Sequence, residues 1–255
     1  MSACYLYAIV RAATPQAALD TAGPGLLDMP LQRVAQDGLA AVVSAWHPAR
    51  PGAAPAADEA DVWRHEQVIE ALMDRGPTLP VRFGTILADA ARVQELLVTR
   101  RADFEIDLAH VADRVEMGLR VLWNPPTLAA VDEAPPRQAP DNVGSPAGPG
   151  RDYLDRLVTQ QRRENSVQAQ GRALADELNT QLRPFAADVH IQVLQSERLL
   201  LSAVYLVENA SVEAFRARIE ALRRIYPSLS FLASGPWPAY HFVSDQPEPA
   251  NTRMP

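Results

Sequence analysis

Cysteine and lysine are the residues that this chain of 255 amino acids most clearly lacks. Its one cysteine, Cys4, has no second thiol with which to form a disulfide inside the chain or a multi-cysteine metal site. All 24 basic residues are arginine, and 31 acidic residues outnumber them, so the net charge is −7. A sequence-independent nucleic-acid binder needs clustered positive charge to displace counterions from phosphates. We therefore expect no nucleic-acid partner.

Long hydrophobic runs are absent too. No window reaches the roughly 18 apolar residues that a membrane-spanning helix requires. The apolar run at residues 5–10 is too short for the core of a secretory signal, and Arg11 follows it directly. We expect a cytoplasmic protein without a membrane partner. Hydrophobic residues make up 47% of the chain, which is enough for real cores in one large or two small domains.

Motifs for catalysis or metal binding are equally scarce. His65 and Glu66 begin a pattern like the zinc-binding HExxH helix, but Ile69 replaces the second histidine, so two imidazoles cannot converge on a metal. No nucleophile elbow, P-loop or dinucleotide fingerprint occurs. We predict no enzymatic activity, no cofactor and no metal. His65 is interpreted as a polar residue at a domain surface, with pairing to an arginine or a carboxylate as the alternative.

Residues 1–123 predict an N-terminal α+β domain. A continuous apolar run at residues 3–10 is typical of a strand buried on both faces. The dipeptide Asp37-Gly38, between two strand-like runs, indicates a two-residue hairpin turn. Asp58 offers a capping oxygen to a following helix, and residues 115–123 alternate with the period of a half-buried strand. These elements favour a small, mostly antiparallel sheet with helices on one face.

Residues 124–150 divide the chain in two. They are rich in proline and glycine and poor in bulky apolar side chains, which is typical of a disordered linker. Residues 151–243 predict a C-terminal domain that begins with a long helix and has the order α-β-β-α-β, compatible with a ferredoxin-like sandwich. The tail at residues 244–255 is expected to be disordered. The predicted fold class is α+β, with two domains that are variants of the ferredoxin-like fold.

The segment 79–87 is the most unusual in the first domain. It combines an entering proline, an apolar run and one arginine, and we interpret it as a single buried strand. A guanidinium can leave water only if its head is paired or reaches an edge, so Arg82 should have a partner that orders the domain. Arg82 and its neighbour Phe83 are therefore candidates for a scaffold or partner-binding role.

Residues 235–243 form the second unusual stretch. Two prolines frame Trp237, and Tyr240 follows shortly after. An aromatic plug that closes a sheet would explain these residues structurally. Aromatic residues and arginine also dominate the binding energy at protein interfaces. Trp237, Tyr240 and His65 are thus further candidates for partner binding or for a scaffold role.

Several blocks of the chain resemble one known family in the same order. The most specific are Leu-Pro-Val-Arg-Phe-Gly-Thr at residues 79–85 and Gly-Pro-Trp-Pro at residues 235–238. The others are the runs at residues 5–10, 39–44, 116–119 and 240–243, together with His65 and Val68. Over nearly its whole length except the linker, the chain is similar to the gas vesicle protein F/L family (GvpL/GvpF). One departure is Ala8, where the family often has glycine.

The resemblance implies an accessory protein for gas vesicles, the gas-filled protein shells of some prokaryotes. It implies two α+β domains and contacts with the small hydrophobic shell protein (GvpA) and with other gas vesicle accessory proteins. The expected role is to bind the shell protein and assist assembly, or to become a minor structural component of the vesicle. A shell subunit with a large exposed apolar face must be shielded before it closes into a wall, which agrees with this role.

Two alternatives stay open on the residues alone. Paired ferredoxin-like sheets often bind metabolites, so the chain could be a small-ligand-binding regulatory module. An enzyme with Arg82 as anion binder and His65 as base would require these two side chains to meet in one cleft.

Overall fold

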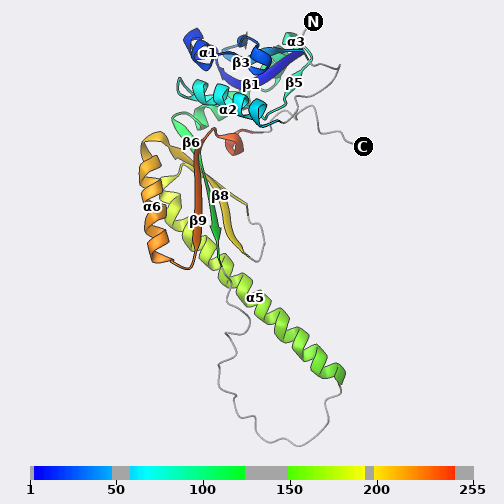
Figure 1. The fold of residues 1–255 in the computed structure, drawn as a ribbon, viewed down its shortest axis with the longest axis vertical. Helices are drawn as coiled ribbons and strands as arrows, with labels where there is room; N and C mark the ends of the chain where they lie inside the picture. The colour runs from blue at the N-terminus through cyan, green and yellow to red at the C-terminus, as the bar shows by residue number, and fades with distance from the viewer. Residues whose placement is uncertain (1–2, 48–57, 124–148, 193–197, 245–255) are drawn as a thin grey trace, which may run out of the picture. The chain divides into compact units, whose positions relative to one another are not determined.

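The computed structural model describes residues 3–47, 58–123, 149–192 and 198–244 (Figure 1). Nearly all of the predicted linker, and the predicted tail beyond Ser244, lie outside the described residues.

The chain forms two compact units, and neither is continuous in the sequence. Unit 1 comprises residues 1–117, 204–212 and 234–255, and unit 2 comprises residues 118–203 and 213–233. This division differs from the contiguous domains expected on the two sides of a linker. The main difference is that residues from the C-terminal end of the chain belong to the same unit as the N-terminal strands.

Unit 1 is built on a five-stranded sheet. Its strands are β1 (Ala3–Arg11), β2 (Gln32–Gln36), β3 (Leu39–Trp46), β4 (Thr78–Pro80) and β5 (Ile86–Leu87). The order is β2-β3-β1-β4, β5 also pairs with β1, and these pairings are antiparallel. The predicted hairpin is confirmed, because Asp37 and Gly38 have the positive φ angles, 49° and 86°, that a two-residue turn needs.

Helices cover both faces of this sheet. The helix α1 (Gln16–Ala22), the short 3-10 helix η1 (Leu26–Asp28) and α2 (Glu59–Met73) contribute to one core, whereas α3 (Ala90–Thr99) and α4 (Arg101–His110) contribute to the other. The buried strand β1 supplies Leu6 to the α3–α4 core and Tyr7 to the α1–α2 core. Its burial on both faces is as predicted, and the second layer of helices goes beyond the single-face arrangement that was expected.

The helix starts in unit 1 follow local chemistry. The Asp58 carboxylate accepts a hydrogen bond of 2.8 Å from the backbone N–H of Asp61, as the capping prediction requires. Asp89 caps α3 in the same way, with a distance of 2.9 Å to the N–H of Arg92. Each carboxylate satisfies a backbone donor that the first turn of a helix leaves without a partner.

The second sheet has four strands in the order β7-β8-β6-β9. In chain order its elements are β6 (Arg114–Leu122), α5 (Pro149–Leu182), β7 (Asp188–Gln192), β8 (Leu199–Glu208), α6 (Val212–Ile225) and β9 (Ser230–Trp237). This is the β-α-β-β-α-β order of a ferredoxin-like sheet. The predicted α+β class, with two mostly antiparallel sheets, is confirmed.

The place of β6 changes the interpretation of the proline-rich segment. The strand predicted at residues 115–123 exists, but it is the first strand of the second sheet and not the last strand of the first. In the sequence, residues 124–148 fall in the connection from β6 to α5. A break in composition therefore marks a long connection inside one fold, and it does not mark a boundary between domains.

The long helix predicted from residue 151 is confirmed as α5, which has 34 residues. Gly171, Leu178 and Leu182 are buried on its packed face. Gly171 lets the Trp123 indole approach closely, because an added Cβ would lie 3.0 Å from a ring carbon. The described side chains at residues 157–166 are exposed, and Figure 1 shows α5 continuing beyond the strands of its sheet.

Candidate functional site

The segment 79–87 is not one strand, so that prediction is wrong. β4 ends at Pro80, β5 begins at Ile86, and both pair with β1. Residues 81–85 form a turn in which the N–H and the hydroxyl of Thr85 donate to the Arg82 carbonyl at 3.3 Å and 2.8 Å. Gly84 has a φ of 84°, a backbone conformation that glycine adopts without strain. We call residues 81–85 the signature turn.

His65 on α2 holds the base of the signature turn. Its Nε2 lies 2.9 Å from the Val81 carbonyl oxygen and its Nδ1 lies 3.0 Å from the Tyr5 hydroxyl. Because a carbonyl only accepts, Nε2 carries the proton, and Nδ1 accepts from Tyr5. The Tyr5 oxygen in turn accepts from the N–H of Gly84 at 3.0 Å. The two ends of the turn are therefore fixed by one chain of hydrogen bonds.

His65 is fully buried, with 0% of its surface exposed, so its interpretation as a surface residue is wrong. Burial lowers the pKa of His65 to about 4, and burial also raises the pKa of Tyr5. Both groups are thus neutral near pH 7. The imidazole stacks on the Tyr7 ring, with 5.5 Å between ring centroids. It packs edge-to-face with the half-buried Phe83 ring, with 5.6 Å between centroids. A polar side chain is accommodated here because both ring nitrogens are bonded.

Arg82 lies at the exposed tip of the signature turn, which contradicts the buried guanidinium expected from the sequence. The turn explains the difference, because it directs the side chain to water and removes the cost of burying the charge. Among the described residues, no hydrogen bond or ion pair involves the Arg82 guanidinium. His65 and Arg82 do not form an anion-binding acid–base pair, since both imidazole nitrogens are engaged inside the core.

Three carboxylates hold the C-terminal segment of unit 1. The Tyr240 hydroxyl, in the short 3-10 helix η4 (Tyr240–Phe242), donates to Glu66 on α2 at 2.7 Å. Glu116 on β6 accepts from the backbone N–H of His241 at 3.0 Å and lies 2.8 Å from its Nδ1. Asp107 on α4 accepts from the N–H and the hydroxyl of Ser244 at 2.9 Å and 3.0 Å. Two of these acids, Asp107 and Glu116, are only 5% exposed.

The two aromatic candidates of residues 235–243 have different surroundings. The Tyr240 ring is half-buried and its hydroxyl is bonded, whereas Trp237 at the end of β9 is 42% exposed. The structure therefore gives Tyr240 a structural contact and leaves Trp237 accessible. The roles of Glu66, Asp107 and Glu116 were not predicted from the sequence, because their spacing in the chain is irregular and their partners are more than 100 positions away.

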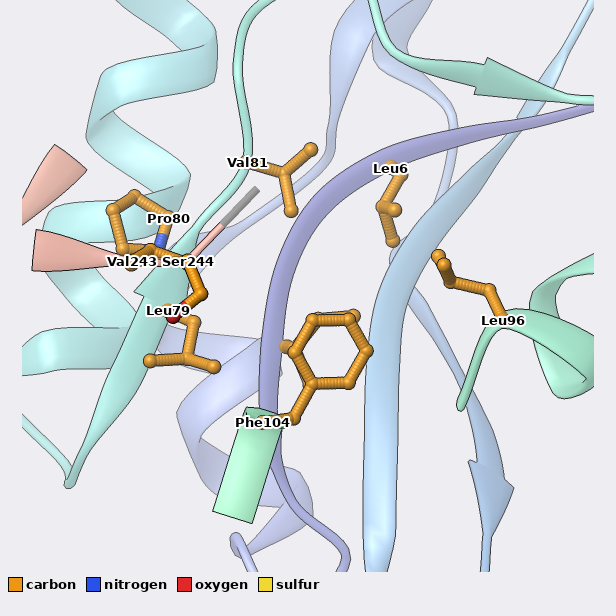
Figure 2. Close-up of a pocket in the computed structure, with 9 residues that line it drawn as sticks. Leu6, Leu79, Pro80, Val81, Leu96, Phe104, Val243 and Ser244 are labelled. Atoms are coloured by element: carbon orange, nitrogen blue, oxygen red, sulfur yellow. The ribbon is translucent and has the colours of Figure 1, made fainter. Parts of the chain in front are cut away.

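A small cavity lies beside the signature turn, between β1, β4 and the α3–α4 side of unit 1 (Figure 2). Its volume is about 10 Å³, and apolar side chains such as Leu6, Leu79 and Phe104 line most of it. A space of this size holds about one water molecule. In the described part of the chain, no group of three or more histidine, cysteine or acidic side chains is placed to hold a metal.

These features define a class of protein: an α+β chain with a buried tyrosine–histidine pair beside a turn that exposes Arg82, followed by a ferredoxin-like sheet. The family model for the gas vesicle synthesis protein GvpL/GvpF matches residues 3–244. The chain belongs to this family, which confirms the resemblance seen in its sequence blocks. Family membership gives it a gas vesicle-related role.

Individual relatives agree with this assignment. Gas vesicle protein F from Streptomyces sp. (strain CB03234) is 28% identical over 251 residues, which cover 94% of this chain and 98% of that protein. Gas vesicle protein L from the same strain is 28% identical over 186 residues, which cover 70% of this chain and 67% of that protein. The crystal structure of GvpF from Anabaena sp. PCC7120 matches with a TM-score of 0.75 at 19% identity, covering 96% of this chain and 98% of that one. This structural likeness shows a shared fold.

Within the described residues, no helix is both long enough and apolar enough to cross a bilayer.

Proposed function

We propose that this chain is a gas vesicle accessory protein that binds the shell protein (GvpA) and assists gas vesicle assembly, without catalysing a reaction. Its proposed partners are the shell protein and other gas vesicle accessory proteins, in the cytoplasm and at the vesicle. The same contact would retain it there as a minor structural component. Family membership supports the link to gas vesicles, and the form of the signature turn supports a binding role.

The observation that carries the proposal is an exposed arginine on a fixed turn. Arg82 is exposed, whereas His65 and Tyr5 anchor the residues on either side of it. A partner that binds the turn has little chain entropy to remove, because the turn is already ordered. Arginine and aromatic residues are also the side chains that most often supply interface energy. We assign Arg82, Phe83 and the exposed Trp237 to the contact.

His65 and Tyr240 have a different proposed role. Both are engaged in hydrogen bonds inside unit 1, His65 with Tyr5 and Val81 and Tyr240 with Glu66. They are scaffold residues that place the contact residues and do not touch the partner. Loss of either side chain should therefore weaken shell-protein binding only in proportion to the loss of folded protein.

The test measures binding of purified shell protein to the immobilised full-length chain. We expect Arg82→Gln to weaken binding at least about tenfold, as loss of an arginine that is a binding hot spot does. Arg11→Gln removes another exposed arginine from the same unit and should bind like the wild type. Equal binding by wild type and Arg82→Gln would remove the signature turn from the contact, and a wild-type chain that fails to bind shell protein would overturn the proposal.

The regulatory-module alternative finds no support in the described residues. Pockets for small molecules typically enclose about 300–1,000 Å³, whereas the cavity beside the signature turn measures about 10 Å³. Helices cover both faces of the first sheet, so no open face of β1 receives a ligand.

A further inference from the structure

We propose that the chain associates with a second copy of itself, head to tail, through the outer face of α2 on one copy and the exposed part of α5 on the next. This interaction goes beyond binding of the shell protein and does not depend on it. The argument rests on two helix faces whose side chains and spacings match.

The outer face of α2 presents a tryptophan between acids. Trp63 is 59% exposed, although tryptophan is usually largely buried. Glu59 and Glu70 are exposed on the same helix face, four residues before and seven residues after Trp63. The opposite face of α2 is the packed one, with His65 and Leu72 in the core. We call Glu59, Trp63 and Glu70 the α2 stripe.

The exposed part of α5 presents arginines around a small residue. Val158, Arg162, Asn165, Ala169 and Arg172 follow one another in steps of three or four, so they lie along one helix face, and all five are exposed. We call them the α5 stripe. It points away from the packed face that contains Gly171 and Leu178. Among the described residues, no ion pair or hydrogen bond involves either arginine head.

The two stripes have matching dimensions. At 1.5 Å per residue, Glu59 and Glu70 are about 16 Å apart along α2, and Arg162 and Arg172 are about 15 Å apart along α5. In an antiparallel pairing, Glu59 faces Arg172 and Glu70 faces Arg162. The same register brings the Trp63 indole opposite Ala169, the small residue of the α5 stripe. An acid–arginine pair thus lies on each side of the Trp63 indole. The small side chain of Ala169 leaves room for the ring.

The stripes also explain how such an interface would behave. Each exposed acid–arginine pair contributes little by itself, so burial of the Trp63 ring would supply most of the stabilisation. The screening length is about 10 Å at 0.1 M ionic strength and shortens as salt is added, so the attraction between these exposed charges, and with it association, should weaken. Because the two stripes lie on different helices of different units, each copy offers one neighbour its α2 and another its α5.

Sedimentation velocity of the full-length chain tests the proposal. At low ionic strength we expect association that grows with protein concentration, and both Trp63→Ala and the double variant Arg162→Glu, Arg172→Glu should weaken it at least about tenfold. The decisive sample is an equimolar mixture of these two variants. Trp63→Ala keeps the α5 stripe and the double variant keeps the α2 stripe, so the mixture should form dimers that grow no further.

Matched controls are available on other helices. Ile106→Ala removes a side chain that is 67% exposed on α4, and Arg224→Glu reverses an exposed charge on α6; both should associate like the wild type. A wild-type chain that stays monomeric at every concentration would overturn the proposal, and so would a variant mixture that stays monomeric. A Trp63→Ala chain that associates normally but loses shell-protein binding would assign the α2 stripe to the shell protein instead.

Discussion

Tyr240 donates a hydrogen bond of 2.7 Å to Glu66, although 174 positions separate the two residues in the chain. Burial raises the pKa of both groups, so the phenol stays protonated as a donor, and its hydrogen bond favours the ionised form of the Glu66 carboxylate. His241 and Ser244 are held by further carboxylates of the same unit. The C-terminal segment is therefore part of unit 1 through specific polar contacts as well as through apolar packing.

Replacing Tyr240 with phenylalanine tests the strength of this contact. The ring is kept, but the carboxylate of Glu66 loses its donor in a half-buried place, so we expect Tyr240→Phe to cost about 1–2 kcal/mol. Tyr226→Phe is the control, because that hydroxyl donates to Glu177 at the same distance of 2.7 Å on the surface. Urea unfolding should show a clearly smaller loss of stability for the control. Equal losses for both variants would contradict the special role of the Tyr240 contact.

His65 should make unit 1 sensitive to acid. Burial lowers its pKa to about 4 in the folded chain, against 6.5 for the free side chain. The unfolded chain therefore binds the proton more readily, and stability is complete above about pH 6.5 and is lost as the pH falls toward 4. From the difference between the two pKa values, this one group should lower the free energy of unfolding by about 3 kcal/mol at pH 4.

A variant without the titrating ring separates this effect from the other acids. We expect His65→Gln to be less stable than the wild type at pH 7, because it breaks the contacts with Tyr5 and Val81. Its free energy of unfolding should then fall less steeply between pH 6.5 and 4.5, measured by urea unfolding at each pH. Parallel pH profiles for the two proteins would show that the buried imidazole is not the group responsible.

The features that could be predicted from the sequence are those with local causes. The hairpin at Asp37-Gly38 and the cap at Asp58 each depend on residues a few positions apart. The βαββαβ order was recognised only in part, because a proline-rich stretch resembles a domain linker wherever it occurs. Nothing in the composition of residues 124–150 says that the strand before them pairs with strands after them.

The features that were missed depend on partners far away in the chain. The segment 79–87 has the composition of a buried strand, and the turn that interrupts it is held by bonds from His65 and Tyr5, which are distant in the sequence. Arg82 was expected to be buried for the same reason, since its neighbours are apolar. The family blocks nevertheless pointed to the correct region, because they contain both the signature turn and the C-terminal segment of unit 1.

Gly84 should be one of the residues on which the signature turn depends. Its φ of 84° is strained for any side chain, and its N–H donates to the buried Tyr5 hydroxyl. We expect Gly84→Ala to lower the free energy of unfolding by about 1–3 kcal/mol. Gly38→Ala measures backbone strain alone, because Gly38 has a similar φ of 86° and no atom within 4 Å of an added Cβ. A smaller cost at Gly84 than at Gly38 would argue against the anchoring of the turn.

Substitution by leucine should affect stability differently at two arginines of unit 1. Arg82 is exposed at the tip of the signature turn, whereas the half-buried Arg33 donates to the carbonyl oxygens of Ala12 and Thr14. We expect Arg82→Leu to change the free energy of unfolding by less than about 0.5 kcal/mol. Arg33→Leu leaves two carbonyl acceptors without their donor and should cost about 1–3 kcal/mol. Thermal and urea unfolding of both variants make the comparison.

If Arg82→Leu costs as much as Arg33→Leu, the guanidinium of Arg82 has a structural partner, and its assignment as a contact residue for the shell protein is wrong.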